Sequence, residues 1–240
     1  MEFKTIVITG ASSGIGAALG RALAAPGRTL ALLGRNTERL EAVAGACRAK
    51  GAICSTASLD LSDTARLATV LDEVGRVSSI GLVIAHAGIL DVRSADDAVG
   101  TASVARRVLE TNLLATVDLV HVVLPAMRRN GRGRIVLVAS LASLVPLPDA
   151  PAYSASKAGL LSYGVALRDA VAAEGIQVVV ACPGFVATAM AARRLGPRGS
   201  VPRMHSTERP PYTPGSGSRL TTPSRVPAIT IASPAACHHP

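Results

Sequence analysis

Residues 4–16 read KTIVITGASSGIG, and this stretch decides the fold. The first six residues form a short β-branched run, as in a buried strand. Glycines follow at positions 10, 14 and 16, and alanine and leucine recur at helical spacing as far as residue 25. Glycines allow a tight turn and a close approach to a pyrophosphate, and the N-terminus of a helix favours negative charge. The stretch therefore predicts a strand, a glycine turn and a helix that bind a dinucleotide, although glycines also build ordinary loops.

The end of the second predicted strand discriminates between two dinucleotides. Residues 29–33 read TLALL and lead into Gly34, Arg35 and Asn36. An acidic residue about 20 positions after the glycine turn would bind the ribose hydroxyl of NAD, but Arg35 stands there instead. A guanidinium suits the 2′-phosphate of NADP by charge and by its donor geometry. Arg35 thus favours NADP(H) and leaves NAD(H) as an alternative cofactor; the other interpretation is an arginine exposed to solvent.

Strand-like and helix-like segments alternate over the first 185 residues. Strands are expected at residues 4–9, 29–33, 52–57, 80–85, 134–139 and 177–181, and helices from the glycine turn to residue 25 and at 37–50, 62–77, 102–129 and 150–174. Right-handed crossovers then give an α/β fold, a doubly wound parallel sheet in a Rossmann-type three-layer sandwich. No linker interrupts the pattern early, so residues 1–196 are expected to form one domain and residues 197–240 an irregular tail.

A second stretch, residues 140–157, reads SLASLVPLPDAPAYSASK and places a serine, a tyrosine and a lysine at spacings that suit carbonyl chemistry. Tyr153 and Lys157 are four residues apart, so on a helix they share one face. A nearby ammonium stabilises the phenolate and lowers the tyrosine pKa from its usual value near 10. The pair can then act as a general acid or base near neutral pH. The alternative is that both residues merely decorate a helix.

Two other polar residues have alternative interpretations. Asp60 follows the third strand and either contacts an adenine or caps the next helix, which Ser62 or Asp63 can also cap. Asn112 lies within an apolar helix and needs hydrogen-bonding partners there. From local sequence, an interhelical hydrogen bond or a helix irregularity accounts for it. Gly88, after the fourth strand, allows a ligand to approach closely.

Composition argues against several classes of function. The net charge is +9, but the basic residues are spread along the chain and aromatic residues make up only 2%, so no nucleic-acid partner is expected. No apolar run reaches the roughly 18–20 residues of a membrane span, and the N-terminus lacks a secretory signal, so a cytoplasmic protein is expected. The four cysteines have no close pairing and no histidines at ligand spacing, so no metal site is expected.

Six features occur in order along the chain: TGASSGIG at 9–16, HAG at 86–88, Asn112, Ser140, YSASK at 153–157 and PG at 183–184. In this combination they resemble the short-chain dehydrogenase/reductase family, in its NAD(P)-dependent members with the shorter subunit. The resemblance covers about residues 3–190. It implies an NADP-preferring oxidoreductase that interconverts a carbonyl and a secondary alcohol by hydride transfer.

The resemblance also implies roles for individual residues. Tyr153 matches the tyrosine that exchanges a proton with the substrate oxygen, and Ser140 would hold that oxygen. Lys157 would bind the nicotinamide ribose and lower the tyrosine pKa, and Asn112 would help to hold a water that relays protons. These four are the candidate catalytic residues. The candidate cofactor-binding residues are Gly10, Ser12, Ser13, Gly14, Ile15, Gly16, Arg35, Asp60, Leu61, Ala87, Gly88, Tyr153, Lys157, Pro183, Gly184, Val186 and Thr188.

The chain departs from the family pattern in two places. His86 stands where the family usually has asparagine, and it is expected to be a tolerated variant at the edge of the cofactor site. From residue 196 onward the sequence is rich in proline and has no sustained period, where the family has substrate-covering helices and a last strand. The alternative function is therefore a catalytically impaired nucleotide-binding protein that lacks a complete substrate lid.

The expected partners follow from the same motifs. Residues 144–152 are apolar and include three prolines, which favours an apolar small-molecule carbonyl or alcohol as substrate. In the family, subunit contacts often use the long helices around Asn112 and Tyr153. A homodimer is compatible with that arrangement.

Overall fold

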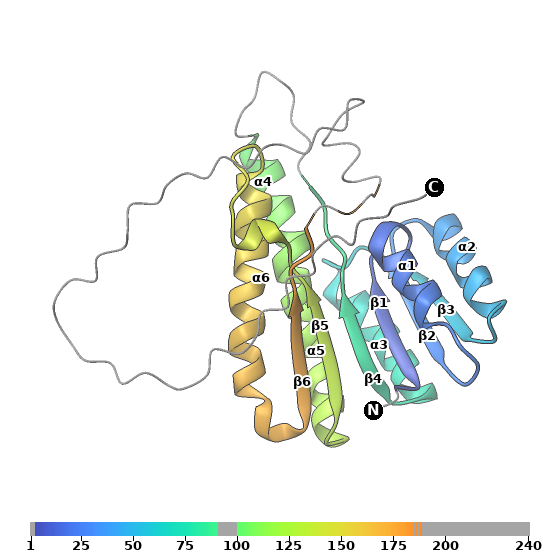
Figure 1. The fold of residues 1–240 in the computed structure, drawn as a ribbon. Helices are drawn as coiled ribbons and strands as arrows, with labels where there is room; N and C mark the ends of the chain where they lie inside the picture. Colours follow the sequence, from blue (N-terminus) through green and yellow to red (C-terminus); the bar gives the residue numbers. More distant parts are fainter. Residues whose placement is uncertain (1–2, 91–99, 185, 187, 189–240) are drawn as a thin grey trace, which may run out of the picture.

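The structure is a computed structural model that describes residues 3–90, 100–184, 186 and 188. In this part of the chain, six parallel strands form one sheet with helices on both faces (Figure 1). The strand order is β3-β2-β1-β4-β5-β6. The chain thus runs outward from β1 to β3, returns across β1 to β4 and continues outward to β6. This is the doubly wound α/β fold that the alternating pattern predicted.

The predicted elements are all found, with ends displaced by a few residues. The strands are β1 (Thr5–Thr9), β2 (Thr29–Gly34), β3 (Ile53–Ser58), β4 (Ile80–Ala85), β5 (Gly133–Val138) and β6 (Ile176–Ala181). The α-helices are α1 (Gly14–Leu23), α2 (Thr37–Arg48), α3 (Thr64–Val77), α4 (Ala102–Leu109), α5 (Ala115–Arg129) and α6 (Pro151–Ala170). Three short segments complete them: the π-helix η1 (Glu110–Leu114) and the 3₁₀ turns η2 (Leu141–Ser143) and η3 (Ala172–Glu174).

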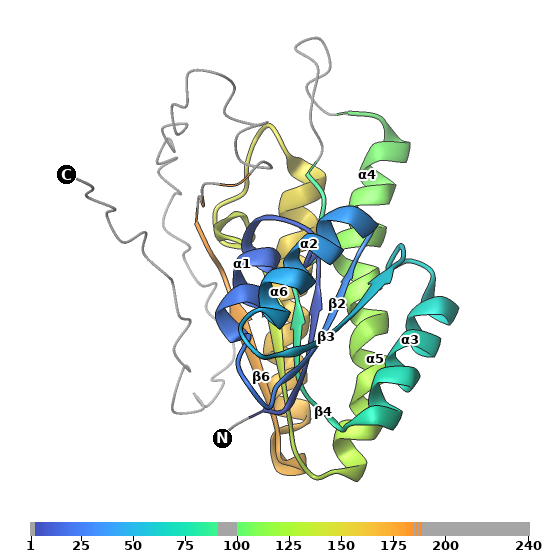
Figure 2. The ribbon, with the colours of Figure 1, turned by 90° about the vertical axis from the view of Figure 1, so that its right-hand side faces the viewer.

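Two apolar cores fill the two sides of the sheet. Successive side chains of a strand point to opposite faces, so Ile6 and Ile8 pack with α1 and α2 while Val7 packs with α3 and α5. Figure 2 shows α1 and α2 on one side of the strands and α3 and α5 on the other. Both cores are built from aliphatic side chains, as a parallel sheet covered on both faces requires.

The long apolar helix expected at residues 102–129 is interrupted. It consists of α4, the π-helical turn η1 and α5, and Asn112 is fully buried in that turn. Within the part of the chain that the structure describes, Ala102–Arg129 is long and apolar enough to cross a membrane by length and composition alone. The core helix of a globular protein passes the same test, and this helix packs against the sheet (Figure 1).

The carboxyl ends of the strands place the predicted functional segments at one edge of the sheet. The glycine turn follows β1, Arg35 follows β2, His86 follows β4, Ser140 follows β5, and the Pro183–Gly184 turn follows β6. Ligands of open α/β sheets bind at this edge, where the strand order reverses. The predicted domain end at residue 196 and the predicted tail at 197–240 lie outside the described residues.

Candidate active site

The glycine turn after β1 has a backbone that only glycine adopts without strain. Gly10 and Gly14 have φ angles of 67° and 54°, in the left-handed region. A Cβ on Gly10 would lie 2.9 Å from the Cα of Ala87, and a Cβ on Gly16 would lie 2.3 Å from the carbonyl oxygen of Gly10. The glycine turn therefore packs directly against the end of β4, and the opposite side of the turn is accessible to a ligand.

A cavity of about 470 Å³ runs along this edge of the sheet. Its walls bring together residues from the glycine turn and from the ends of β2 to β6. The predicted site residues that line it are Gly10, Ser12, Ser13, Gly14, Ile15, Arg35, Asp60, Leu61, Ala87, Gly88, Ser140, Tyr153, Lys157, Pro183, Gly184, Val186 and Thr188. Gly16 and Asn112 do not line the cavity. Both lie behind its wall, where Gly16 shapes the turn and Asn112 joins neighbouring elements.

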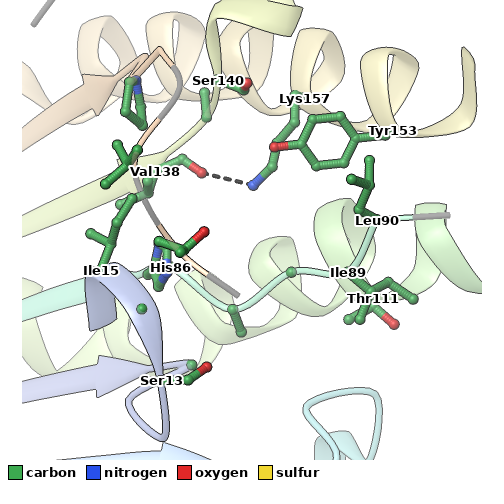
Figure 3. Close-up of a pocket in the computed structure, with 18 of the residues that line it drawn as sticks. Ser13, Ile15, His86, Ile89, Leu90, Thr111, Val138, Ser140, Tyr153 and Lys157 are labelled. Carbon is green, nitrogen blue, oxygen red and sulfur yellow. Dashed lines mark hydrogen bonds between the residues drawn. The ribbon is translucent and has the colours of Figure 1, made fainter. Parts of the chain in front are cut away.

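Tyr153 and Lys157 lie side by side on α6, as their spacing predicts. The Lys157 ammonium lies 5.9 Å from the centre of the Tyr153 ring and donates a hydrogen bond of 2.8 Å to the carbonyl oxygen of Val138 (Figure 3). Lys157 is only 4% exposed. Burial lowers the pKa of Lys157 to about 8, and the nearby Cys182 thiol offsets part of that shift. The ammonium is thus held rigidly beside the phenol.

Ser140 is delivered to the cavity by the end of β5 and begins the turn η2. Its hydroxyl oxygen accepts a hydrogen bond of 3.1 Å from the Ala142 amide, and its own amide donates to the Ser143 hydroxyl at 3.3 Å. Among the described residues the Ser140 hydroxyl proton has no acceptor. It is therefore available to an oxygen atom of a ligand in the cavity.

Asn112 connects the segment after β4 to α6. Its Oδ1 accepts from the Ile89 amide at 2.7 Å, while its Nδ2 donates to the Ile89 carbonyl at 2.9 Å and to the Ser156 hydroxyl at 3.1 Å. The Ser156 hydroxyl in turn donates to the Tyr153 carbonyl at 2.7 Å. Both local interpretations of Asn112 are present together, because a hydrogen bond between elements occurs at a helix irregularity. The partner Ser156 was missed, although it stands inside the YSASK motif.

The far end of the cavity carries two guanidinium groups. Arg35 and Arg39 both line it, and Asn36 between them caps α2 by accepting from the Arg39 amide at 2.8 Å. Sequence reasoning missed Arg39, whose only signal was its position in the first turn of the helix after Arg35. Asp63 caps α3 by accepting from the Arg66 amide at 3.0 Å.

Asp60 reaches the same end of the cavity and also shapes its own turn. Its carboxylate accepts from the Ser62 amide at 3.0 Å and from the Ser62 hydroxyl at 2.7 Å. These hydrogen bonds lower the pKa of Asp60, and the charge of Arg35 adds a smaller effect. The carboxylate therefore supports the turn after β3, whereas an adenine contact stays a prediction.

His86 lies on the cavity wall beside Ile15 (Figure 3). The amides of His86 and Ala87 each donate to the Thr9 hydroxyl at 3.1 Å. These hydrogen bonds connect the end of β4 to the end of β1. Burial lowers the pKa of His86 to about 4, with a smaller contribution from the Lys157 charge, so the imidazole is neutral at pH 7. Its Nδ1 is buried without a hydrogen-bonding partner in the described part of the chain. No local pattern in the sequence indicates this burial.

Comparison with known proteins agrees with this arrangement. A family model described as short chain dehydrogenase matches residues 4–197. The ketoacyl reductase HetN of Nostoc sp. is 34% identical over 76% of this chain and 63% of its own length. The dehydrogenase/reductase SDR family member 7B of Danio rerio is 34% identical over 83% of this chain and 66% of its own length. The chain thus spans just under two thirds of these two relatives.

A solved structure shares both the fold and the sequence pattern. It is a candidate NAD(P)-dependent gluconate 5-dehydrogenase from Beutenbergia cavernae with NADP bound at low occupancy. The two chains superpose with a TM-score of 0.74 and are 31% identical, over 81% of this chain and 77% of the other. The fold and sequence matches therefore agree, and the chain belongs to the short-chain dehydrogenase/reductase family of NAD(P)-binding oxidoreductases.

Proposed function

We propose that the protein is an NADP-preferring oxidoreductase that interconverts a carbonyl and a secondary alcohol, with Tyr153 as the general acid and base. The observation that carries this proposal is that Tyr153, Lys157 and Ser140 line the same cavity as the glycine turn. A phenol that can exchange a proton, an ammonium group and a nucleotide-binding turn (the nucleotide cradle) thus line one cavity. The proposed reaction uses all three, because it moves a hydride to or from the carbonyl carbon and a proton to or from its oxygen.

The cavity has the features that a dinucleotide needs. Gly10 and Gly14, with positive φ angles, line the cavity with backbone that carries no side chain. The N-terminus of α1 favours the negative charge of a diphosphate there. Arg35 and Arg39 would hold the 2′-phosphate of NADP, because two guanidinium groups match its charge and its oxygens. The residues after β6 would hold the nicotinamide end. When bound, NADP(H) supplies or accepts the hydride.

The residues of the chain account for the proton side of the reaction. The Ser140 hydroxyl donates to the substrate oxygen, and the Tyr153 phenol gives it a proton during reduction or takes one during oxidation. The Lys157 ammonium favours the phenolate by its charge. Since burial lowers the pKa of Lys157 to about 8, this support is complete only below that pH. A relay water held by Asn112 would return the proton to solvent.

The substrate side of the cavity is apolar among the described residues. Leu90, Val145 and Leu147 line it, and Val145 is 41% exposed. These side chains favour a carbonyl compound with an apolar body, since burying them against a ligand removes apolar surface from water. We further propose a cytoplasmic protein. We also propose a homodimer formed through the helices around Asn112 and Tyr153, where Leu114 at the end of η1 is 52% exposed.

The second candidate function is binding of the nucleotide without turnover. The observation that favours it is that the family model matches only as far as residue 197 of 240. The residues that follow are those in which the family has its substrate cover. In that case the protein would bind NADPH and reduce no carbonyl compound.

Two measurements on the full chain distinguish these functions. NADPH binding is followed by cofactor fluorescence, and turnover is followed by NADPH oxidation with a panel of apolar ketones and aldehydes. The proposal expects both in the wild type, and binding without turnover in Tyr153→Phe. Binding without turnover in the wild type, over the whole panel, favours the nucleotide-binding function.

A further inference from the structure

We propose that Ser143 is a positioning residue that fixes the two catalytic groups Ser140 and Lys157 relative to each other. The proposal rests on the proposed function and adds a residue that the family motifs do not contain. Ser143 lies in the turn η2, three residues after Ser140, and half-buried between β5 and α6.

One hydroxyl group makes both connections. The Ser140 amide donates to the Ser143 Oγ at 3.3 Å, and the Ser143 Oγ donates to the carbonyl oxygen of Lys157 at 2.8 Å. The second bond joins residues 14 positions apart in the sequence. The backbone of the catalytic serine is thereby tied to the backbone of the catalytic lysine through a single side-chain atom.

Cys182 completes the surroundings of this hydroxyl. The thiol is 1% exposed, and burial raises its pKa; the Ser140 amide, the Lys157 charge and the Ser143 hydroxyl offset part of that rise. A hydroxyl has one proton and two acceptor sites. The Ser143 hydroxyl gives its proton to the Lys157 carbonyl and accepts from the Ser140 amide, so it makes both bonds at the same time.

Hydrogen bonds therefore hold α6 in place on two sides. On one side, Asn112 holds Ser156, which donates to the Tyr153 carbonyl. On the other side, Ser143 holds the Lys157 carbonyl, and the Lys157 ammonium bonds to Val138, two residues before Ser140. Removing Ser143 leaves α6 attached through Asn112 but frees the Ser140 turn to shift against it. A displacement of about 1 Å between reacting groups can lower a rate about 100-fold.

Ser143 also stabilises the short turn η2 through its bond to the Ser140 amide. If this were its only role, Ser143→Ala would affect stability and leave the chemical step unchanged. The matched control is Ser154→Ala. Ser154 is a buried serine on α6 that accepts from the Leu147 amide at 2.9 Å, so it anchors the same loop without touching Ser140 or Lys157.

The test compares wild type with Ser143→Ala, Ser143→Thr and Ser154→Ala by steady-state kinetics and by hydrogen exchange of the Ser140 amide. For Ser143→Ala we expect kcat to fall about 10- to 100-fold, while the KM for NADPH stays within about threefold of the wild-type value. The Ser140 amide should exchange faster. In Ser143→Thr, both kcat and the exchange rate should return toward the wild-type values. A kcat within about threefold of wild type, or an equal fall in Ser154→Ala, overturns the proposal. If the wild type binds NADPH but shows no turnover, the proposed function fails. The positioning role of Ser143 is then tested by the hydrogen-exchange rate of the Ser140 amide alone. An exchange rate that is no faster in Ser143→Ala than in the wild type overturns that role.

Discussion

Replacing Lys157 with methionine should change how the stability of the protein depends on pH. Lys157 is 4% exposed, and burial lowers its pKa from 10.5 to about 8. Below pH 8 the lysine is protonated in both the folded and the unfolded state, and the folded state carries the cost of a buried charge. As pH rises toward 10.5 the folded state releases its proton first, so the wild type gains stability in this range.

The size of the effect follows from the two pKa values. At pH 7 a shift from 10.5 to about 8 corresponds to about 3 kcal/mol of destabilisation. At pH 9.5, where the unfolded lysine is still mostly protonated, about 1.4 kcal/mol remains. The wild type should therefore gain about 2 kcal/mol relative to Lys157→Met between pH 7 and pH 9.5. The lost hydrogen bond to Val138 shifts the variant by an amount that does not depend on pH in this range.

Urea unfolding of both proteins without nucleotide, at several pH values, measures this difference directly. Most other groups that titrate in the range are shared by the two proteins and cancel. Cys182 and Tyr153 lie close to Lys157, so the comparison is repeated in a Cys182→Ala, Tyr153→Phe background to remove their contributions. Lys50→Met is the control for loss of an exposed lysine. A difference between wild type and Lys157→Met that stays constant with pH, or an equal trend in the control, would refute the conclusion that Lys157 is a buried cation.

Two further predictions concern the nucleotide cradle. Arg35→Asp should weaken NADPH binding at least tenfold and leave NADH binding within about threefold, because a carboxylate repels the 2′-phosphate. Fluorescence titration with both nucleotides measures the two affinities. Equal affinity of the wild type for NADPH and NADH would contradict the role of Arg35. Gly16→Ala should lower the free energy of unfolding by about 1–3 kcal/mol, since its Cβ would lie 2.3 Å from the backbone oxygen of Gly10. Urea unfolding tests it, and an unchanged midpoint would show that the turn can relax.

The fold was predictable because each strand and helix has its own local pattern. The glycine turn, the apolar strand at residues 80–85 and the helical spacing of residues 37–50 each indicate one element, and the parallel order follows from their alternation. The π-helical turn at Asn112 was not predictable as a conformation. Its hydrogen bonds go to Ile89 and Ser156, which are 23 and 44 residues away in the sequence.

The same distinction applies to the site. The spacing of Tyr153 and Lys157 on one helix indicates a pair directly, whereas the roles of Ser143 and His86 depend on neighbours that only the folded chain supplies. His86 was expected to be a tolerated variant at the edge of the cofactor site, but its burial could not be predicted, because β1, the glycine turn and Lys157 surround it. Arg39 belongs to no motif in the sequence, and it lines the cavity because α2 begins shortly after the end of β2.

The central claim is that this cavity transfers hydride to a carbonyl carbon while Tyr153 supplies the proton. Deuterium transfer tests it most directly: wild type and Tyr153→Phe are incubated with NADPH deuterated at the nicotinamide C4 and the panel of apolar carbonyl compounds. We predict deuterium on the carbinol carbon of at least one product with the wild type, and none above background with Tyr153→Phe although it still binds NADPH. Equal transfer by both proteins would contradict the role of Tyr153, and nucleotide binding without transfer by the wild type would contradict the proposed reaction.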